Sequence, residues 1–240
     1  MITTIYYTAN REPASFEAKI RANLLRVNPW PLISVSQKPL PEFGHNICVG
    51  DVGMHDANAL RQIQIGAEAA TTPFVAYAEA DALYPREYFE FVPPVVDACY
   101  RYDNIWILSM WRPRDGQHMV FHRKRYSECA QIIGRDFLLQ HLDATLKGRP
   151  LWSHPEDIRP GLVFRLKPPE WTLFTGGTSI VNVKTGRGLR MKTRTLLGED
   201  SATLGHWGEA DRLQRWLAHG TDIRGIPDTL DQCPFPQGSR

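Results

Sequence analysis

The opening of the chain alternates between apolar runs and a helical stripe in the order of a β-α-β unit. An apolar run at Ile2–Tyr7 predicts a strand, and a second short run at Leu32–Val35 predicts another. Between them, apolar residues recur at helical spacing over residues 16–27, after a proline that suits the first turn of a helix. Such a unit favours parallel strands with a right-handed crossover, so we expect the polar turn at residues 8–11 to lie at the carboxyl end of the first strand.

Apolar periodicity predicts further elements along the rest of the chain. The run Phe74–Ala78 has the length and composition of a buried strand. Residues 39–54 are rich in proline and glycine and predict irregular structure. The other expected elements are helices at 57–70, 126–147 and 209–218, a helix beginning at Pro85, and strands at 105–110, 119–121 and 179–183. This order favours one Rossmann-like α/β domain, with a mixed, mainly parallel sheet flanked by helices and a loop-rich C-terminal elaboration.

Two carboxylates, Glu79 and Asp81, directly follow the Phe74–Ala78 strand. If the strand geometry persists through Ala80, both side chains project to the same side, at the sheet edge where open α/β sheets bind ligands. Neighbouring carboxylates repel each other, and a hard divalent cation such as Mg²⁺ or Mn²⁺ relieves that repulsion. The pattern indicates a metal site that would hold a diphosphate, although a solvated Glu and Asp in a strand-to-helix loop would have the same spacing.

Composition narrows the class of protein. The 240 residues, of which 42% are hydrophobic, suffice for one domain with a good core. Four widely spaced cysteines without a Cys-x-x-Cys pair favour neither a zinc ribbon nor a disulfide framework, which suits a reducing compartment. The chain has no run of about 18 apolar residues and its start lacks the pattern of a signal peptide, so we expect a cytoplasmic protein without a membrane span.

Charge is unevenly divided along the chain. The formal net charge is +2, but residues 1–100 carry 7 Lys and Arg against 11 Asp and Glu, and residues 101–240 carry 21 against 15. The basic part includes two clusters, at residues 122–125 and 184–194, with aromatic residues nearby. This distribution suits a polyanionic partner, although a nucleotide diphosphate or plain solvation would explain part of it.

Four stretches resemble segments of one protein family: AEADALYPREYF at 78–89, YSECAQIIGRDFLLQHL at 126–142, VNVKTGRGLRMKTRT at 181–195 and HWGEADRL at 206–213. With the β-α-β opening, they resemble the GT-A fold of nucleotide-sugar-dependent glycosyltransferases, and in particular a group of small bacterial and bacteriophage or other viral members with an E-x-D-x-L-Y-P motif. The resemblance covers about residues 1–215. It implies a domain at 1–220, with a donor half at 1–100 and an acceptor half at 101–220, and a Pro/Gly-rich tail at 221–240.

The resemblance implies a metal-dependent reaction. Asp81, with Glu79 directly or through water, would hold Mn²⁺ or Mg²⁺ against the diphosphate of a nucleoside-diphosphate sugar. In the related group a histidine often stands where this chain has Thr185, so a third metal ligand has to come from elsewhere. We expect it from His206 or His154, although a histidine in either place is also a common surface residue.

The remaining roles concern the donor and the acceptor. An inverting enzyme needs a base for the acceptor hydroxyl, and Glu128, near the start of the predicted 126–147 helix, has the corresponding place, with Asp136 as the second candidate. A retaining enzyme needs no such base. Asn10 would serve equally well as a helix cap or in nucleotide binding. The candidates for binding the donor are Thr8, Asn10 and Arg11 for the nucleotide, and Lys184, Arg187, Arg190 and Lys192 for the phosphates.

The acceptor and the reaction class keep alternatives open. The basic clusters and nearby aromatic residues favour duplex DNA that carries a hydroxymethylated pyrimidine such as hydroxymethylcytosine, as in some bacteriophages, over a saccharide or glycolipid-linked acceptor. A nucleotidyltransferase would share the acidic pair but carry a Gly-rich loop after the first strand, and residues 8–16 contain no glycine. A non-catalytic nucleotide-binding module is the other alternative. The oligomeric state is left open.

Overall fold

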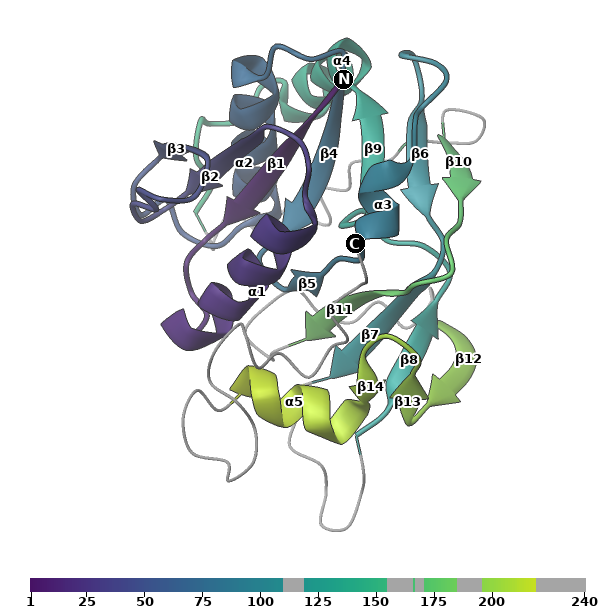
Figure 1. Ribbon diagram of the computed structural model, residues 1–240. Helices are drawn as coiled ribbons and strands as arrows, with labels where there is room; N and C mark the ends of the chain where they lie inside the picture. Colours follow the sequence, from purple (N-terminus) through teal and green to yellow (C-terminus); the bar gives the residue numbers. More distant parts are fainter. Residues whose placement is uncertain (110–118, 155–165, 167–170, 185–195, 219–240) are drawn as a thin grey trace.

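Figure 1 shows a computed structural model of the chain, which describes residues 1–109, 119–154, 166, 171–184 and 196–218. Its larger sheet has seven strands in the order β10-β6-β9-β4-β1-β2-β3. Strand β9 runs antiparallel to its neighbours β4 and β6, and the other pairings in this sheet are parallel. The strands are β1 (Ile2–Thr8), β2 (Leu32–Ser36), β3 (His45–Cys48), β4 (Phe74–Glu79), β6 (Cys99–Tyr102), β9 (Gln131–Gly134) and β10 (Trp171–Phe174).

Helices cover both faces of this sheet and close two hydrophobic cores. Side chains alternate along β1, so Ile2 and Tyr6 pack with residues of α1 while Ile5 packs with residues of α2. Helix α4 lies beside α2 on the second face, and α5 contacts α1 from below the sheet in the view of Figure 1. The helices are α1 (Ala14–Val27), α2 (Asp56–Ala69), α3 (Arg86–Glu90), α4 (Arg135–Leu146) and α5 (Ala210–Ala218).

A second sheet, of five strands in the order β12-β8-β7-β11-β5, extends the core on the α1 side. The chain passes from β4 of the first sheet to β5 of the second within two residues, Ala80 and Asp81. The end of β11 therefore lies next to this crossing, because β11 pairs with β5. The strands are β5 (Ala82–Leu83), β7 (Ile105–Ser109), β8 (Phe121–Lys124), β11 (Ile180–Lys184) and β12 (Leu196–Ser201), and a small hairpin adds β13 (Thr203–Leu204) and β14 (Gly208–Glu209).

The expected fold class, a mixed, mainly parallel sheet flanked by helices, is confirmed. The β-α-β opening is also confirmed, since β1 and β2 are parallel neighbours joined by α1. The strands predicted at 105–110, 119–121 and 179–183 correspond to β7, β8 and β11, with ends shifted by up to three residues. The tail predicted at 221–240 lies outside the described residues.

Two predictions of secondary structure are wrong. The helix expected at 126–147 begins only at Arg135, and strand β9 precedes it. Ile132 and Ile133 are both fully buried because β9 lies inside the sheet between β4 and β6, so its sequence lacks the alternation that identifies a strand. The segment 39–54 contains the edge strand β3, and β6 was not predicted.

Within the described residues, no helix has both the length and the apolar character required to cross a membrane.

Candidate functional site

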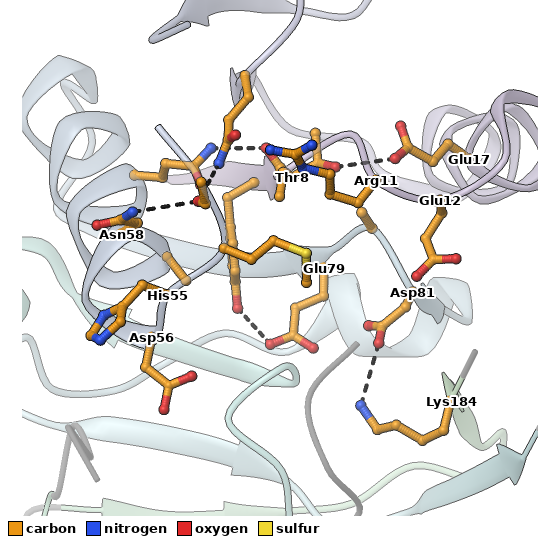
Figure 2. Close-up of a pocket in the computed structure, with 18 residues that line it drawn as sticks. Thr8, Arg11, Glu12, Glu17, His55, Asp56, Asn58, Glu79, Asp81 and Lys184 are labelled. Atoms are coloured by element: carbon orange, nitrogen blue, oxygen red, sulfur yellow. Dashed lines mark hydrogen bonds and ion pairs between the residues drawn. The ribbon is translucent and has the colours of Figure 1, made fainter. Parts of the chain in front are cut away.

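A pocket of about 250 Å³ opens at the carboxyl ends of β1, β2 and β4. Parallel strands of an open α/β sheet present their loops at this edge, where such sheets bind ligands. The start of α2 and the end of β11 complete its wall (Figure 2). Its lining includes the predicted residues Thr8, Arg11, Glu79, Asp81 and Lys184, together with Tyr7, Gln37, His55, Asp56, Asn58 and Gln62.

Glu79 is the last residue of β4 and lies beside Tyr7 of the neighbouring strand β1. The Tyr7 hydroxyl donates a hydrogen bond of 2.5 Å to Glu79 Oε1. Burial, followed by the nearby charge of Asp81, raises the pKa of Glu79 from its ordinary value of 4.5 to about 7. The fold therefore holds this carboxylate where burial and a neighbouring negative charge disfavour its ionised form.

Asp81 occupies the crossing between the two sheets and is held there by β11. Its backbone carbonyl accepts a hydrogen bond of 2.6 Å from the Val183 N–H. Its carboxylate accepts one of 3.1 Å from Asn182 Nδ2 on Oδ1, and Oδ2 lies 3.3 Å from Lys184 Nζ. Figure 2 shows Lys184 extending from β11 toward Asp81, with the Glu79 carboxylate on the same side of the pocket.

Two lysines supply positive charge near the acidic pair. Burial by itself would lower the pKa of Lys184, but the charges of Asp81 and Glu79 outweigh it and the pKa is raised. Lys124, at the end of β8, has its pKa lowered chiefly by burial, and its ammonium donates a hydrogen bond of 3.0 Å to Ser127 Oγ. Lys184 thus stays protonated at neutral pH and directly contacts Asp81.

Asn10 braces the loops at this edge and does not cap α1, whose N-cap residue is Pro13. It adopts a positive φ of 50°, and its Oδ1 accepts hydrogen bonds of 2.9 Å from the backbone N–H groups of Gln37 and Lys38. Its Nδ2 donates to Glu17 Oε2 at 3.2 Å. These contacts tie the end of β1 to the end of β2.

Sequence reasoning missed the contribution of residues before and within the first turns of α2. His55 is the N-cap of this helix, where its Nδ1 accepts a hydrogen bond of 3.0 Å from the Ala57 N–H. Gln62 Nε2 donates to the carbonyls of Thr8 and Val35 at 2.9 and 3.0 Å, which holds α2 against the ends of β1 and β2. The polar residues on one side of the predicted 57–70 helix, Asn58 and Gln62 among them, were the signal available in the sequence.

The structure separates the two candidate bases. Glu128 is half-buried in the turn before β9, and its charge acts on the pKa of Lys124, as does the charge of Glu79. Asp136 lies in the first turn of α4 and forms an exposed ion pair of 2.8 Å with Arg135. The Arg135 N–H donates a hydrogen bond to the carbonyl of Pro73, which directly precedes β4. Glu79, in contrast, is the last residue of β4. Asp136 therefore lies at the opposite edge of the sheet from the acidic pair.

No group of three or more His, Cys, Asp and Glu side chains that could hold a metal ion occurs among the residues that the structure describes. His206 packs edge-on against Trp207, and burial, then the charge of Arg26, lowers its pKa. His154 lines a different pocket, next to Trp152. Neither histidine joins Glu79 and Asp81. Arg187, Arg190 and Lys192 lie outside the described residues.

The oxygen atoms at the site nonetheless suit a hard cation. Two carboxylates from Glu79 and Asp81 share one pocket, and burial together with the charge of Asp81 raises the pKa of Glu79. Asn182 Oδ1 is buried without a hydrogen-bond partner, beside Asp81. Carboxylate and amide oxygens are ligands that Mg²⁺ and Mn²⁺ prefer, and Mg²⁺ commonly keeps several waters, so two carboxylates plus substrate phosphates are a sufficient set.

Comparisons with known proteins give remote likenesses only. No protein-family model and no curated protein matches the chain. Similar solved structures include a glycosyltransferase involved in the glycosylation of the major capsid of PBCV-1, at 11% identity and a TM-score of 0.40, which covers 75% of this chain and 91% of that one. Another is the glycosyltransferase GlyE of Streptococcus pneumoniae TIGR4, at 12% identity and a TM-score of 0.39 over 72% of this chain and 44% of that one. At these TM-scores we infer the function from the site itself.

Proposed function

We propose that this chain is a metal-dependent, GT-A-type glycosyltransferase that moves a sugar from a nucleoside-diphosphate sugar to an acceptor hydroxyl. One observation carries the proposal: Glu79 and Asp81 open into the same pocket as the loop after β1, at the carboxyl edge of a mainly parallel sheet. Nucleotides bind at that edge in open α/β sheets, and the diphosphate of a donor bound there would face the acidic pair and Lys184.

The pocket offers the donor two kinds of surroundings. The ends of β1 and β2, with Thr8 and Gln37, would contact the nucleoside, and Arg11 stands at the rim, where it pairs with Asp51 at 2.6 Å. Lys184 would donate a charge-assisted hydrogen bond to a phosphate oxygen. Asp81 and Glu79 would hold Mn²⁺ or Mg²⁺, which when bound offsets the charge that develops on the departing diphosphate.

Glu128 is the proposed base of an inverting reaction. As the acceptor oxygen bonds to the anomeric carbon and the bond to the diphosphate breaks, a carboxylate has to accept the hydroxyl proton. Glu128 directly precedes the buried turn residues Cys129 and Ala130, and the Cys129 carbonyl accepts a 2.7 Å hydrogen bond from Tyr84, whose hydroxyl in turn accepts from the Glu79 N–H. This turn is thereby fixed relative to the acidic pair. A retaining reaction would leave Glu128 without that role.

The proposed acceptor remains a hydroxymethylated pyrimidine in duplex DNA, with a saccharide or glycolipid-linked hydroxyl as the alternative. The structure of the basic cluster 122–125 supports a DNA acceptor less strongly than its sequence does, because three of its four side chains contact other described residues of the chain. His122 pairs with Asp200 at 2.7 Å, Arg123 stacks over Trp106 at 5.4 Å, and Lys124 is held by Ser127. Arg125 is the exposed member of this cluster.

Donor binding and turnover test the function. We expect UDP or GDP to raise the melting temperature in Mn²⁺ more than in EDTA, and hydrolysis or transfer of the matching nucleotide sugar to require the metal. Asp81→Asn should lower turnover at least about 10²-fold at saturating Mn²⁺, while the protein still folds. Asp97→Asn is the matched control, since Asp97 is exposed and lies in the loop that precedes β6.

The outcomes separate the candidate classes. The expected loss of turnover is roughly 10²-fold. If Asp81→Asn instead kept turnover within about tenfold of wild type, Glu79 and Asp81 would be excluded as the metal site. Nucleotide binding without sugar transfer would indicate a binding module. Release of pyrophosphate from a nucleoside triphosphate, in the presence of a sugar phosphate, would instead identify a nucleotidyltransferase.

A further inference from the structure

Asp81 already has a cation beside it. Lys184 Nζ lies 3.3 Å from Asp81 Oδ2, and the two side chains are only 13% and 20% exposed. Asn182 Nδ2 occupies the other carboxylate oxygen, Oδ1, at 3.1 Å. Because a divalent cation binds a carboxylate oxygen at about 2.0–2.2 Å, it has to approach Asp81 through the space beside these donors. A lysine ammonium and a metal ion that both contacted Oδ2 would lie close together, and their positive charges would repel each other.

We propose that Lys184 competes with the divalent cation for Asp81, so that the metal binds firmly only when a diphosphate draws the lysine away. This inference rests on the proposed function, because it takes a nucleoside diphosphate as the ligand. In the empty site the ammonium neutralises Asp81. When the donor arrives, its phosphate oxygens offer the ammonium an equally good partner, and Asp81 becomes available to the metal.

The exchange needs only a side-chain movement. The backbone at the end of β11 is fixed on two sides, by its pairing with β7 and by the hydrogen bond from Val183 N–H to the Asp81 carbonyl. Lys184 is the last residue of the strand and carries its ammonium on a flexible four-carbon stem, which can swing without disturbing that pairing. The backbone around Asp81 thus stays in place while the metal ion replaces the lysine ammonium beside the carboxylate.

Electrostatics ties the two binding events together. If Lys184 left Asp81 without replacement, two neighbouring carboxylates would face each other with little positive charge between them. If the metal entered while Lys184 stayed, two cations would lie a few ångströms apart. Metal and diphosphate should therefore each raise the affinity for the other, with Lys184 contributing part of that coupling.

The test measures Mn²⁺ binding directly, by the EPR signal of free Mn²⁺ and by calorimetry, with no turnover. Wild type, Lys184→Met and Lys184→Gln are compared without nucleotide and with saturating UDP or GDP. Methionine keeps an unbranched apolar stem without the charge, and glutamine retains a donor for Asp81. Lys147→Met, which removes an exposed lysine just after α4, is the matched control for loss of one positive charge.

Removing the charge of Lys184 should tighten Mn²⁺ binding without nucleotide by about tenfold or more, and should reduce the gain produced by nucleotide by a similar factor. Lys147→Met should bind Mn²⁺ as wild type does. The inference is overturned if both Lys184 variants bind Mn²⁺ no better than wild type, while wild type binds it with nucleotide; the proposed metal-dependent function would then stand. If neither nucleotide promotes Mn²⁺ binding to any of these proteins, the inference and the metal-dependent function both fail.

Discussion

The carboxylate of Glu79 is held where its charge is unfavourable, and this has a consequence for stability. Its pKa of about 7 in the fold lies above the ordinary value of 4.5. Between these pH values the unfolded chain releases the proton and the folded chain keeps it, so the free energy of unfolding falls as pH rises and levels off above about pH 7. Below about pH 4.5 both states are protonated and the penalty is absent.

We therefore expect Glu79→Gln to stabilise the metal-free protein at pH 8, by about 1–3 kcal/mol more than at pH 5. The measurement is urea unfolding of both proteins at the two pH values in EDTA. Glu68→Gln, an exposed substitution on α2, is the control and should show no such pH-dependent difference. An equal effect of Glu79→Gln at both pH values would mean that Glu79 titrates as an ordinary carboxyl.

Substitution of the two candidate bases distinguishes their roles. Glu128→Gln is nearly isosteric and should slow sugar transfer roughly 10²-fold or more with little change in donor affinity, as expected for loss of a general base. Asp136→Asn should leave transfer near the wild-type rate, because Asp136 pairs with Arg135 at the far edge of the sheet. Single-turnover rates and nucleotide affinity would be measured for both. A slow Asp136→Asn with a normal Glu128→Gln would reverse the assignment.

The location of a single residue in the fold was predictable from the sequence where the residue stands at the end of a recognisable strand. Glu79 and Asp81 follow a short buried strand, and this was enough to place both at the ligand-binding edge. Their partners were not predictable in the same way. Asn182 and Tyr7 are far from Asp81 and Glu79 in sequence, and only the pairing of β11 with β5 and of β1 with β4 brings them together.

At the scale of elements, the error at 126–147 traces to one buried strand. Strand β9 has no exposed face, and its apolar residues continue into the stripe of α4, so periodicity alone cannot show where the strand ends. Gly134 marks that boundary in the structure. A Cβ built on Gly134 would lie 1.4 Å from the Val96 carbonyl oxygen, so the loop before β6 crosses directly over the junction of β9 and α4.

Gly134→Ala should consequently destabilise the protein severely, by about 3 kcal/mol or more, because backbone rather than a flexible side chain has to move. Gly205→Ala is the matched control, since a Cβ there meets nothing within 4 Å. Thermal and urea unfolding of both variants would be compared with wild type. A Gly134→Ala protein as stable as the control would show that the chain near Val96 takes another path.

At the scale of the whole molecule, the two sheets meet at Ala80 and Asp81, between β4 and β5. The basic cluster 122–125 lies on the second sheet, along β8 and just after it. Charge counted along the sequence overstated what this cluster presents to a polyanion. Sequence shows that the residues are basic, but not that the fold engages three of them internally, with Asp200, Trp106 and Ser127. The contribution of a surface to DNA binding depends on the charges that can reach phosphates.

This difference predicts how DNA binding should respond to single substitutions. If duplex DNA is the acceptor, Arg125→Gln should reduce the slope of log affinity against log salt by about 0.9, the loss of one phosphate contact. Arg123→Gln removes the same charge from a side chain packed over Trp106 and should leave the slope unchanged. Both would be measured by fluorescence anisotropy with duplexes containing or lacking hydroxymethylcytosine, and digestion to nucleosides after incubation with nucleotide sugars would show whether the base gains the mass of a sugar. Equal slopes for all three proteins, together with transfer to a free oligosaccharide, would replace the DNA acceptor with a saccharide and leave the donor site as proposed.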